Sequence, residues 1–236
     1  MFIGIGTPIP EIANLPGSSR PGGGSSPAFE YTAIDNGFSM EFDGISHYDA
    51  DNLTTLNGTQ DATVCCWIKR ATSSSTTSGN IVSTVGTSIR DHGVSLRLRP
   101  SDGRLDCLVG FPSPSGGYAT GTVTNITDTN WHHIAVVIDR AAFTRTVYVD
   151  GVDTNTETKN SYSMSGLYRG FTIGARALDG VNGFIGYIDE VAVFASKLSD
   201  TTIQAIYDAT ANNPGKVADL SETPEGAPEA WYRMGD

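Results

Sequence analysis

Hydrophobic and polar residues alternate in short segments along most of the chain, between about residues 29 and 194. The apolar positions are rich in β-branched and aromatic residues, and clusters of Gly, Asn, Ser and Asp separate the segments. A repeat of two residues is typical of β-strands, whose successive side chains point to opposite faces. The pattern predicts strands in GFSMEFDG, ATVCCWIKR, GNIVSTVG, VSLRLRP, RLDCLVGF, HHIAVVID, RTVYVDG, RGFTIGAR and FIGYIDEVAVF. Many short strands with regular turns favour a β-sandwich or a barrel.

One helix is predicted after the last of these strands, in the segment LSDTTIQAIYDAT. Its apolar positions repeat at helical rather than strand spacing. Ser199 is a favoured N-cap residue, and Asp200 places a negative charge in the first turn. Leu198 and Ile203 have the spacing of a hydrophobic staple, which fixes the direction in which the chain enters a helix.

The two ends of the chain differ from the middle. The first 27 residues hold five of the eleven prolines and a run of three glycines, so we expect an extended arm rather than a packed core. The last segment is acidic and contains proline until AWYRMGD, and we expect Trp231 and Tyr232 to pack back on the rest. The predicted division is an N-terminal arm (1–27), a β-domain (28–210) and an acidic C-terminal tail (211–236).

Composition and charge narrow the classes of partner. Hydrophobic residues make up 39% of the chain, which is too many for a disordered protein. Fifteen basic and 26 acidic side chains give a formal net charge of −11, which would repel a phosphate backbone. The N-terminus lacks the pattern of a secretory signal, and no apolar run reaches the length of a membrane span. We therefore expect neither nucleic-acid binding nor membrane insertion.

The histidines and cysteines are predicted to be structural. On a strand, His132 and His133 point to opposite faces, so the two cannot bind one metal ion together. Both faces of that strand are apolar in the middle, as in the central strand of a sheet that is covered on both sides. Cys65, Cys66 and Cys107 show no CxxC spacing and no disulfide framework, and we expect buried free thiols.

Four motifs occur in a fixed order: Phe42-Asp43-Gly44, Trp131-His132-His133, Tyr148-Val149-Asp150-Gly151 and Ile188-Asp189-Glu190-Val191. With the helix that follows, this set resembles the laminin-G-like jelly rolls of the concanavalin A-like lectin and glucanase superfamily, over about residues 36–210. The resemblance implies an all-β sandwich of two curved antiparallel sheets with one short C-terminal helix. Such jelly rolls commonly bind glycans or proteins.

The sequences of the two ends resemble those of virion structural proteins of tailed phages, especially marine ones. This resemblance implies a non-enzymatic protein of the virion surface, in a head decoration, a fibre or another part of the tail. The arm would anchor the protein to a capsid or tail protein of the same virion. The jelly roll would face outward, as part of a homo-oligomer, and could reach a glycan on a cell surface.

Glycan-binding residues are expected on loops, where aromatic rings stack on sugars and charged side chains hold hydroxyl groups. Tyr48 in SHYDAD and Tyr118 in SPSGGYATG are the aromatic candidates. Arg176 and Asp179 in GARALDGVNG are the charged candidates. The alternative is that each of these residues is exposed on a loop and binds no ligand.

Asp189 is the candidate metal ligand. By the family resemblance, the aspartate of the Ile-Asp-Glu strand holds a structural calcium ion together with oxygen atoms near the early Phe-Asp-Gly strand. Asp43, or the carbonyl group of Gly44, would then be the second ligand, since calcium prefers oxygen ligands. The alternative is that Asp189 accepts hydrogen bonds from a neighbouring loop.

The carboxylates do not follow the pattern of a glycosidase. Retaining glucanases of the superfamily carry acids at alternate positions of one strand, so that two carboxylates flank the scissile bond. In the nearest segment, GYIDEVAV, Tyr187 occupies the nucleophile position, and Asp189 and Glu190 are adjacent. We therefore predict a protein without enzymatic activity. The alternatives to a virion surface protein are a free carbohydrate-binding or adhesion module and a glycan hydrolase.

Overall fold

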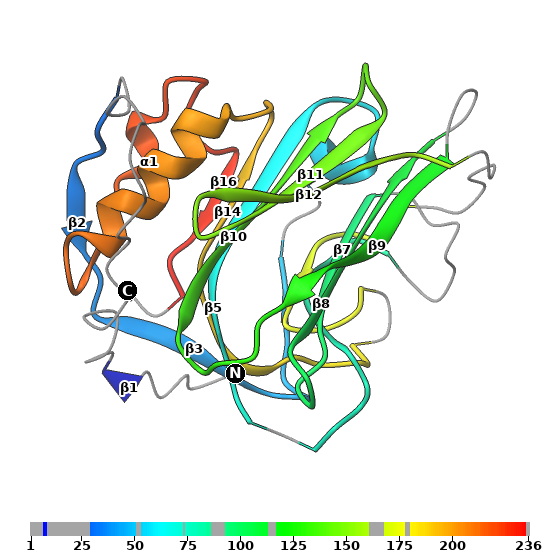
Figure 1. The fold of residues 1–236 in the computed structure, drawn as a ribbon, viewed down its shortest axis with the longest axis horizontal. Coiled ribbons are helices and arrows are strands. Elements are labelled where there is room, and N and C mark those ends of the chain that lie inside the picture. Colours follow the sequence, from blue (N-terminus) through cyan, green and yellow to red (C-terminus); the bar gives the residue numbers. More distant parts are fainter. Residues whose placement is uncertain are drawn as a thin grey trace.

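Two antiparallel β-sheets pack face to face and form a sandwich (Figure 1). The structure, a computed structural model, describes residues 7–8, 29–50, 53–72, 74–85, 93–112, 117–160, 168–177 and 180–234. The jelly-roll sandwich predicted from the sequence is confirmed, and all nine predicted segments contain a strand.

The first sheet has eight strands. In spatial order they are β1 (Thr7–Pro8), β3 (Phe38–Asp43), β14 (Ile185–Phe194), β5 (Ala62–Arg70), β10 (Trp131–Asp139), β11 (Thr144–Val149) and β12 (Val152–Thr158), with β16 (Ala230–Tyr232) also paired to β14. Strands β11 and β12 form a hairpin in which Asp150 and Gly151 have φ angles of 52° and 77°. The predicted role of the Asp-Gly pair as a tight turn is therefore confirmed.

The second sheet has six strands. Their spatial order is β4 (Tyr48–Asp49), β13 (Thr172–Ile173), β6 (Gly79–Ser83), β7 (Gly93–Leu98), β8 (Arg104–Phe111) and β9 (Gly117–Asn125). A separate pair of short strands, β2 (Ala33–Asp35) and β15 (Lys216–Ala218), lies beside the helix. Two single turns of 3-10 helix, η2 (Thr54–Asn57) and η3 (Leu220–Glu222), and the helix α1 (Asp200–Ala211) complete the described elements.

The first sheet is covered on both of its faces. Its inner face packs on the second sheet in the main core, which contains Cys66, Ile134 and Val136. Its outer face packs on the helix α1 (Asp200–Ala211) in a second core, which contains Cys65 and Ala135. Neighbouring residues of β5 and β10 therefore lie in different cores, which explains why both faces of these strands are apolar. All three cysteines are buried free thiols, as predicted.

The helix begins as the sequence predicts. The Ser199 side chain accepts a hydrogen bond from the backbone N–H of Thr202, at 3.3 Å. Glu225 also contacts this end of the helix, because its carboxylate accepts hydrogen bonds from the backbone of Ser199 and from the Thr202 hydroxyl. On the face that covers the sheet, Ile203 and Ile206 are buried.

Replacing Ser199 with alanine should lower the free energy of unfolding by about 1 kcal/mol, because an N–H group of the first turn loses its acceptor. Urea denaturation measures this difference. Ser199→Thr is the matched control, since threonine keeps the capping oxygen and should behave like the parent protein. Equal stability of Ser199→Ala and the parent would show that the other contacts alone cap the helix.

The C-terminal segment is part of the sandwich rather than a detached tail. Strand β15 pairs with β2, and β16 pairs with β14 in the first sheet. The Trp231 indole donates a hydrogen bond of 2.6 Å to the Glu190 carboxylate. Met234 and Tyr232 contact the main core. Trp231 and Tyr232 therefore pack back on the domain, as expected, and they add a strand to it.

The N-terminal arm lies outside the described residues, apart from Thr7 and Pro8. The backbone of this dipeptide pairs with Phe38 and Ser39 at one edge of the first sheet. Anchoring by the arm stays a prediction. Among the described residues, no helix has the length and apolarity needed to cross a membrane.

Candidate functional site

A polar row crosses four neighbouring strands of the second sheet. Asn80 of β6 lies opposite Arg97 of β7, Arg97 lies opposite Asp106 of β8, and Asp106 lies opposite Thr122 of β9. Residues directly opposite each other in an antiparallel sheet point to the same face. The intervening side chains, such as Leu96 and Cys107, belong to the main core, so the polar row lies on the outer face of the sheet. We call this outer surface of β7, β8 and β9 the arginine face.

Two arginines flank one buried aspartate on the arginine face. The Asp106 side chain is 6% exposed and accepts hydrogen bonds from Nε of Arg104 at 2.9 and 3.0 Å. It also accepts a hydrogen bond of 2.9 Å from the Thr122 hydroxyl. The hydrogen bond and charge of Asp106 raise the pKa of Arg104. Asp106 therefore holds Arg104 in place on the sheet.

Arg97 is bonded differently from Arg104. Its Nε atom is buried and has no hydrogen-bond partner, and its guanidinium group forms no ion pair with any residue that the structure describes. The neighbouring amide of Asn80 is held by Ser95, whose hydroxyl donates to Asn80 Oδ1 at 2.9 Å. The arginine face thus carries two guanidinium groups and one carboxylate, an excess of one positive charge.

Tyr118, a predicted glycan-binding residue, lies on the same face. It is opposite Gly110 in β8, a residue that has no side chain. Thr122 is four residues further along β9 than Tyr118, a distance of about 13 Å. Thr120 points to the same face between them, and Thr120 and Thr122 are both exposed. Arginine, hydroxyl and aromatic groups therefore share one accessible surface.

The other predicted residues lie elsewhere. Tyr48 is on β4, at the opposite edge of the second sheet, where the residue is 44% exposed and its ring centroid lies 5.8 Å from that of Tyr232. Arg176 belongs to a turn closed by hydrogen bonds with Val181 and Gly180, and this turn packs on His47 through Gly180. The structure thus brings the segments of Tyr48 and Arg176 together and separates them from Tyr118. Asp179 lies outside the described residues.

Residues 42–204 match a laminin G family model described as the concanavalin A-like lectin/glucanases superfamily. This match covers more than half of the chain. The chain belongs to this superfamily. No curated protein sequence matches the chain significantly.

Solved structures of other proteins share the fold of this superfamily member. A Bacteroides ovatus protein provisionally assigned to carbohydrate binding gives a TM-score of 0.57 at 18% identity, over 88% of this chain and 53% of that chain. The binding domain of Paraclostridial Mosquitocidal Protein 1 gives a TM-score of 0.55 at 13% identity, over 76% of this chain and 45% of that chain. The CBM40 module of the Ruminococcus gnavus IT-sialidase, bound to α2,3-sialyllactose, gives a TM-score of 0.55 at 14% identity, over 72% of this chain and 96% of that chain. The present chain spans about half the length of the first two proteins. At these sequence identities, the likeness shows a shared fold only.

Asp189 of the present protein is 1% exposed, and its side chain forms hydrogen bonds within the protein. Its carboxylate accepts hydrogen bonds of 2.8 Å from the Asn36 side chain and from the backbone N–H of Glu190. This is the hydrogen-bonding arrangement that the sequence left open as the alternative to calcium.

Asp43 does not share a site with Asp189. Asp43 lies opposite Ile185, and Asp189 is four residues further along β14, a distance of about 13 Å. Calcium–oxygen distances are about 2.3–2.6 Å, so one calcium ion cannot bridge the two carboxylates. Asp43 instead accepts hydrogen bonds from the backbone of Ser46 and Ile45, which lower its pKa. The two carboxylates are therefore too far apart in this structure to bind one calcium ion together, and a calcium site at Asp189 stays a prediction.

Glu190 occupies a β-bulge with a φ angle of 50°, a conformation that non-glycine residues rarely adopt. Its carboxylate accepts hydrogen bonds from Trp231 and, at 3.3 Å, from Nε of Arg233. Asp189 and Glu190 are thus each bound to different partners inside the superfamily member, and both side chains are buried. This arrangement does not present the two carboxylates to one sugar.

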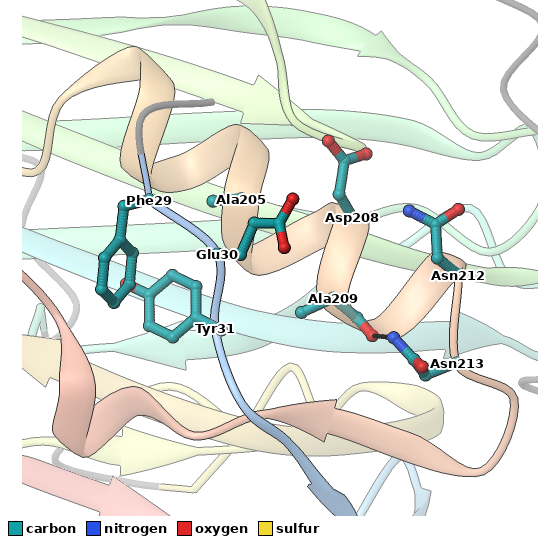
Figure 2. A pocket seen from close by; sticks show the side chains of 8 residues that line it. All are labelled: Phe29, Glu30, Tyr31, Ala205, Asp208, Ala209, Asn212 and Asn213. Carbon is teal, nitrogen blue, oxygen red and sulfur yellow. Dashed lines mark hydrogen bonds between the residues drawn. The ribbon is translucent and has the colours of Figure 1, made fainter. Parts of the chain in front are cut away.

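A cleft of about 270 Å³ lies between residues 29–31 and the second half of α1 (Figure 2). Phe29 and Tyr31 form an edge-to-face pair on one side, and Asp208 is on the helix opposite. Glu30 and Asp208 are the charged residues of the lining, and both carry carboxylates. The C-terminal end of a helix is also the negative end of its dipole. The sequence did not point to this cleft, and its electrostatic character is opposite to that of the arginine face.

Proposed function

We propose that the protein binds glycans through the arginine face, without enzymatic activity. The observation that carries the proposal is the juxtaposition of Arg97, Arg104, Thr122 and Tyr118 on one sheet face of a lectin-type sandwich. Hydroxyl and guanidinium groups can hold sugar hydroxyls, and a tyrosine ring offers a stacking surface. The superfamily fold and the sialyllactose bound to the CBM40 module support this proposal.

The proposed setting is the surface of a tailed-phage virion. The resemblance of the chain ends to phage virion proteins supports this setting, and so does the Pro/Gly-rich arm. In this proposal the arm binds a capsid or tail protein, and the domain forms a homo-oligomer whose glycan-binding faces point outward. A free carbohydrate-binding or adhesion module is the second candidate. Antibodies against the folded chain should label phage particles in electron micrographs, whereas labelling of unattached protein alone would favour the second candidate.

The full chain should bind members of an immobilised glycan panel, and Arg97→Ala should lose most of this binding. Arg140→Ala is the matched control, because Arg140 lies in the β10–β11 turn, where its guanidinium group contacts the Phe143 ring. Incubation with the bound polysaccharides should release no reducing sugar. Binding that Arg97→Ala leaves unchanged would place the site elsewhere, and release of reducing sugar would favour the hydrolase alternative.

A further inference from the structure

Arg97 is the side chain that defines the chemistry of the ligand. Burying a guanidinium nitrogen without a hydrogen-bond partner costs free energy, and this cost disappears when an acceptor binds. Arg97 Nε is such a nitrogen and is itself closed to solvent, but the side chain as a whole is only half-buried, so a ligand can approach the rest of the guanidinium group. An acceptor bound there would add a hydrogen bond to a guanidinium group that lacks one at Nε within the protein.

Asp106 does not serve as the hydrogen-bond acceptor for Arg97. The register places it directly opposite Arg97, yet the two side chains form no ion pair, and the Asp106 oxygens accept from Arg104 and Thr122 instead. Arg104 is two residues from Asp106 on β8, so it is a diagonal neighbour of Arg97 on the same face, with about 7–8 Å between the two residues, and its side chain is 43% exposed. The two guanidinium groups can therefore act on one anionic group.

The distribution of charge on the described surface also favours the arginine face as the place where an anionic ligand binds. The cleft beside α1 is lined by two carboxylates. A second groove, of about 470 Å³, is lined by Asp139, Asp200 and Glu225, and its one cation, Lys197, is paired with Asp139 at 2.7 Å. With a net charge of −11, the protein repels an anionic ligand except where positive charge is concentrated. The arginine face provides such a concentration.

We propose that the ligand is an acidic glycan and that Arg97, assisted by Arg104, binds the carboxylate group of one of its sugars. A planar guanidinium group matches a carboxylate with two parallel hydrogen bonds. The hydroxyls of Thr120 and Thr122 border this position. Tyr118, about 13 Å away, then stacks on another sugar of the same chain, so the site takes a short oligosaccharide. This inference rests on the proposed function and adds the class of sugar.

The test uses the full chain and oligosaccharides that share one backbone and differ in a single group: carboxylated, sulfated or neutral. Isothermal titration should show at least tenfold tighter binding of the carboxylated form than of the neutral form, and the affinity should fall with added salt. Arg97→Ala should weaken binding of the carboxylated form at least tenfold. Tyr118→Ala should weaken binding of the oligosaccharide but not of the isolated acidic sugar. Arg140→Ala should bind like the parent.

Thermal melting must show that each variant is folded, and Arg97→Gln replaces Arg97→Ala if the alanine variant is not. Equal affinity for carboxylated and neutral forms would overturn this inference while leaving glycan binding intact. Tighter binding of the sulfated form would also overturn it, because it commits to a carboxylate. Binding of no oligosaccharide at all would overturn the proposed function together with it.

Discussion

Replacing Arg70 with methionine should lower the free energy of unfolding by at least about 3 kcal/mol, since three carbonyl groups lose their donor and each buried acceptor left without a partner costs about 1–3 kcal/mol. Arg70 is the last residue of β5 and is buried. Its guanidinium group donates three hydrogen bonds of 2.7–2.8 Å to the carbonyl groups of Asp128, Pro100 and Thr127. Methionine fills a similar volume without donors, and the three carbonyl groups lose their partner.

The position of these carbonyl groups explains the size of the effect. Pro100 lies in the β7–β8 turn of the second sheet, and residues 127–128 connect β9 to β10. Arg70 therefore joins the two sheets at one end of the sandwich. Urea denaturation measures the loss, and Arg99→Met is the matched control, because Arg99 forms an exposed pair with Asp102 in the same turn and should matter little. A loss below about 1 kcal/mol for Arg70→Met would contradict this role.

Acidification from pH 6.5 to pH 4 should remove about 3 kcal/mol of stability through His133 alone. The ring is buried against Trp67, with 5.3 Å between the centroids, and neither of its nitrogens has a hydrogen-bond partner. Burial lowers the pKa of His133 to about 4, against 6.5 in an exposed histidine. Between these two values the unfolded chain binds a proton that the folded protein does not. Stability therefore falls as the pH falls through this window.

His133→Phe isolates this contribution, because phenylalanine keeps an aromatic ring beside Trp67 and cannot titrate. The free energy of unfolding of this variant, measured in urea at each pH, should depend less steeply on pH between 6.5 and 4. The groups around the ring are Cys65 and Glu190, which share a small cavity with it, and Asp150, which accepts a hydrogen bond from the His133 backbone. The same pH dependence in the parent and in His133→Phe would refute the assignment.

His132 provides the contrasting control. Burial alone would lower its pKa, but hydrogen bonds and charges of Asp150, at 2.8 Å, and Asp128, at 3.0 Å, outweigh burial and raise it. A raised pKa stabilises the protein fully below the pKa of the unfolded chain, and this stabilisation is lost as the pH rises through the folded value. His132→Gln should therefore lose more stability at pH 5 than at pH 8, the reverse of the His133 effect.

The strands that the sequence predicted are those with an apolar face. Strands β9 and β12 were not predicted, and each lies at the edge of its sheet. Their sequences, GYATGTVTN and VDTNTET, are rich in threonine, which suits strands, but apolar residues do not alternate in them. An edge strand exposes more of its side chains, so the pattern that reveals a buried strand is weak there. The bulge at Glu190 was also hidden, because no glycine marks it.

The residues of the arginine face illustrate a different limit of prediction from the sequence. Tyr118 was selected from the sequence as an aromatic residue among turn residues, although it lies on strand β9, whereas Arg97, Arg104 and Asp106 were not selected. They occur in VSLRLRP and RLDCLVGF, which are correctly predicted as strands. Their proximity depends on which residues of β7, β8 and β9 lie opposite each other. That register is fixed by packing of the whole sheet rather than by any one strand.

The most direct test of glycan binding at the arginine face is an NMR titration of the ¹⁵N-labelled full chain with a bound oligosaccharide. Chemical-shift changes should centre on the backbone amides of β7, β8 and β9 and on the side-chain Nε–H of Arg97 and Arg104. Residues around Tyr48 and residues of the cleft beside α1 should change little. Changes centred on either of those regions, with β7–β9 unaffected, would contradict the assignment of the site.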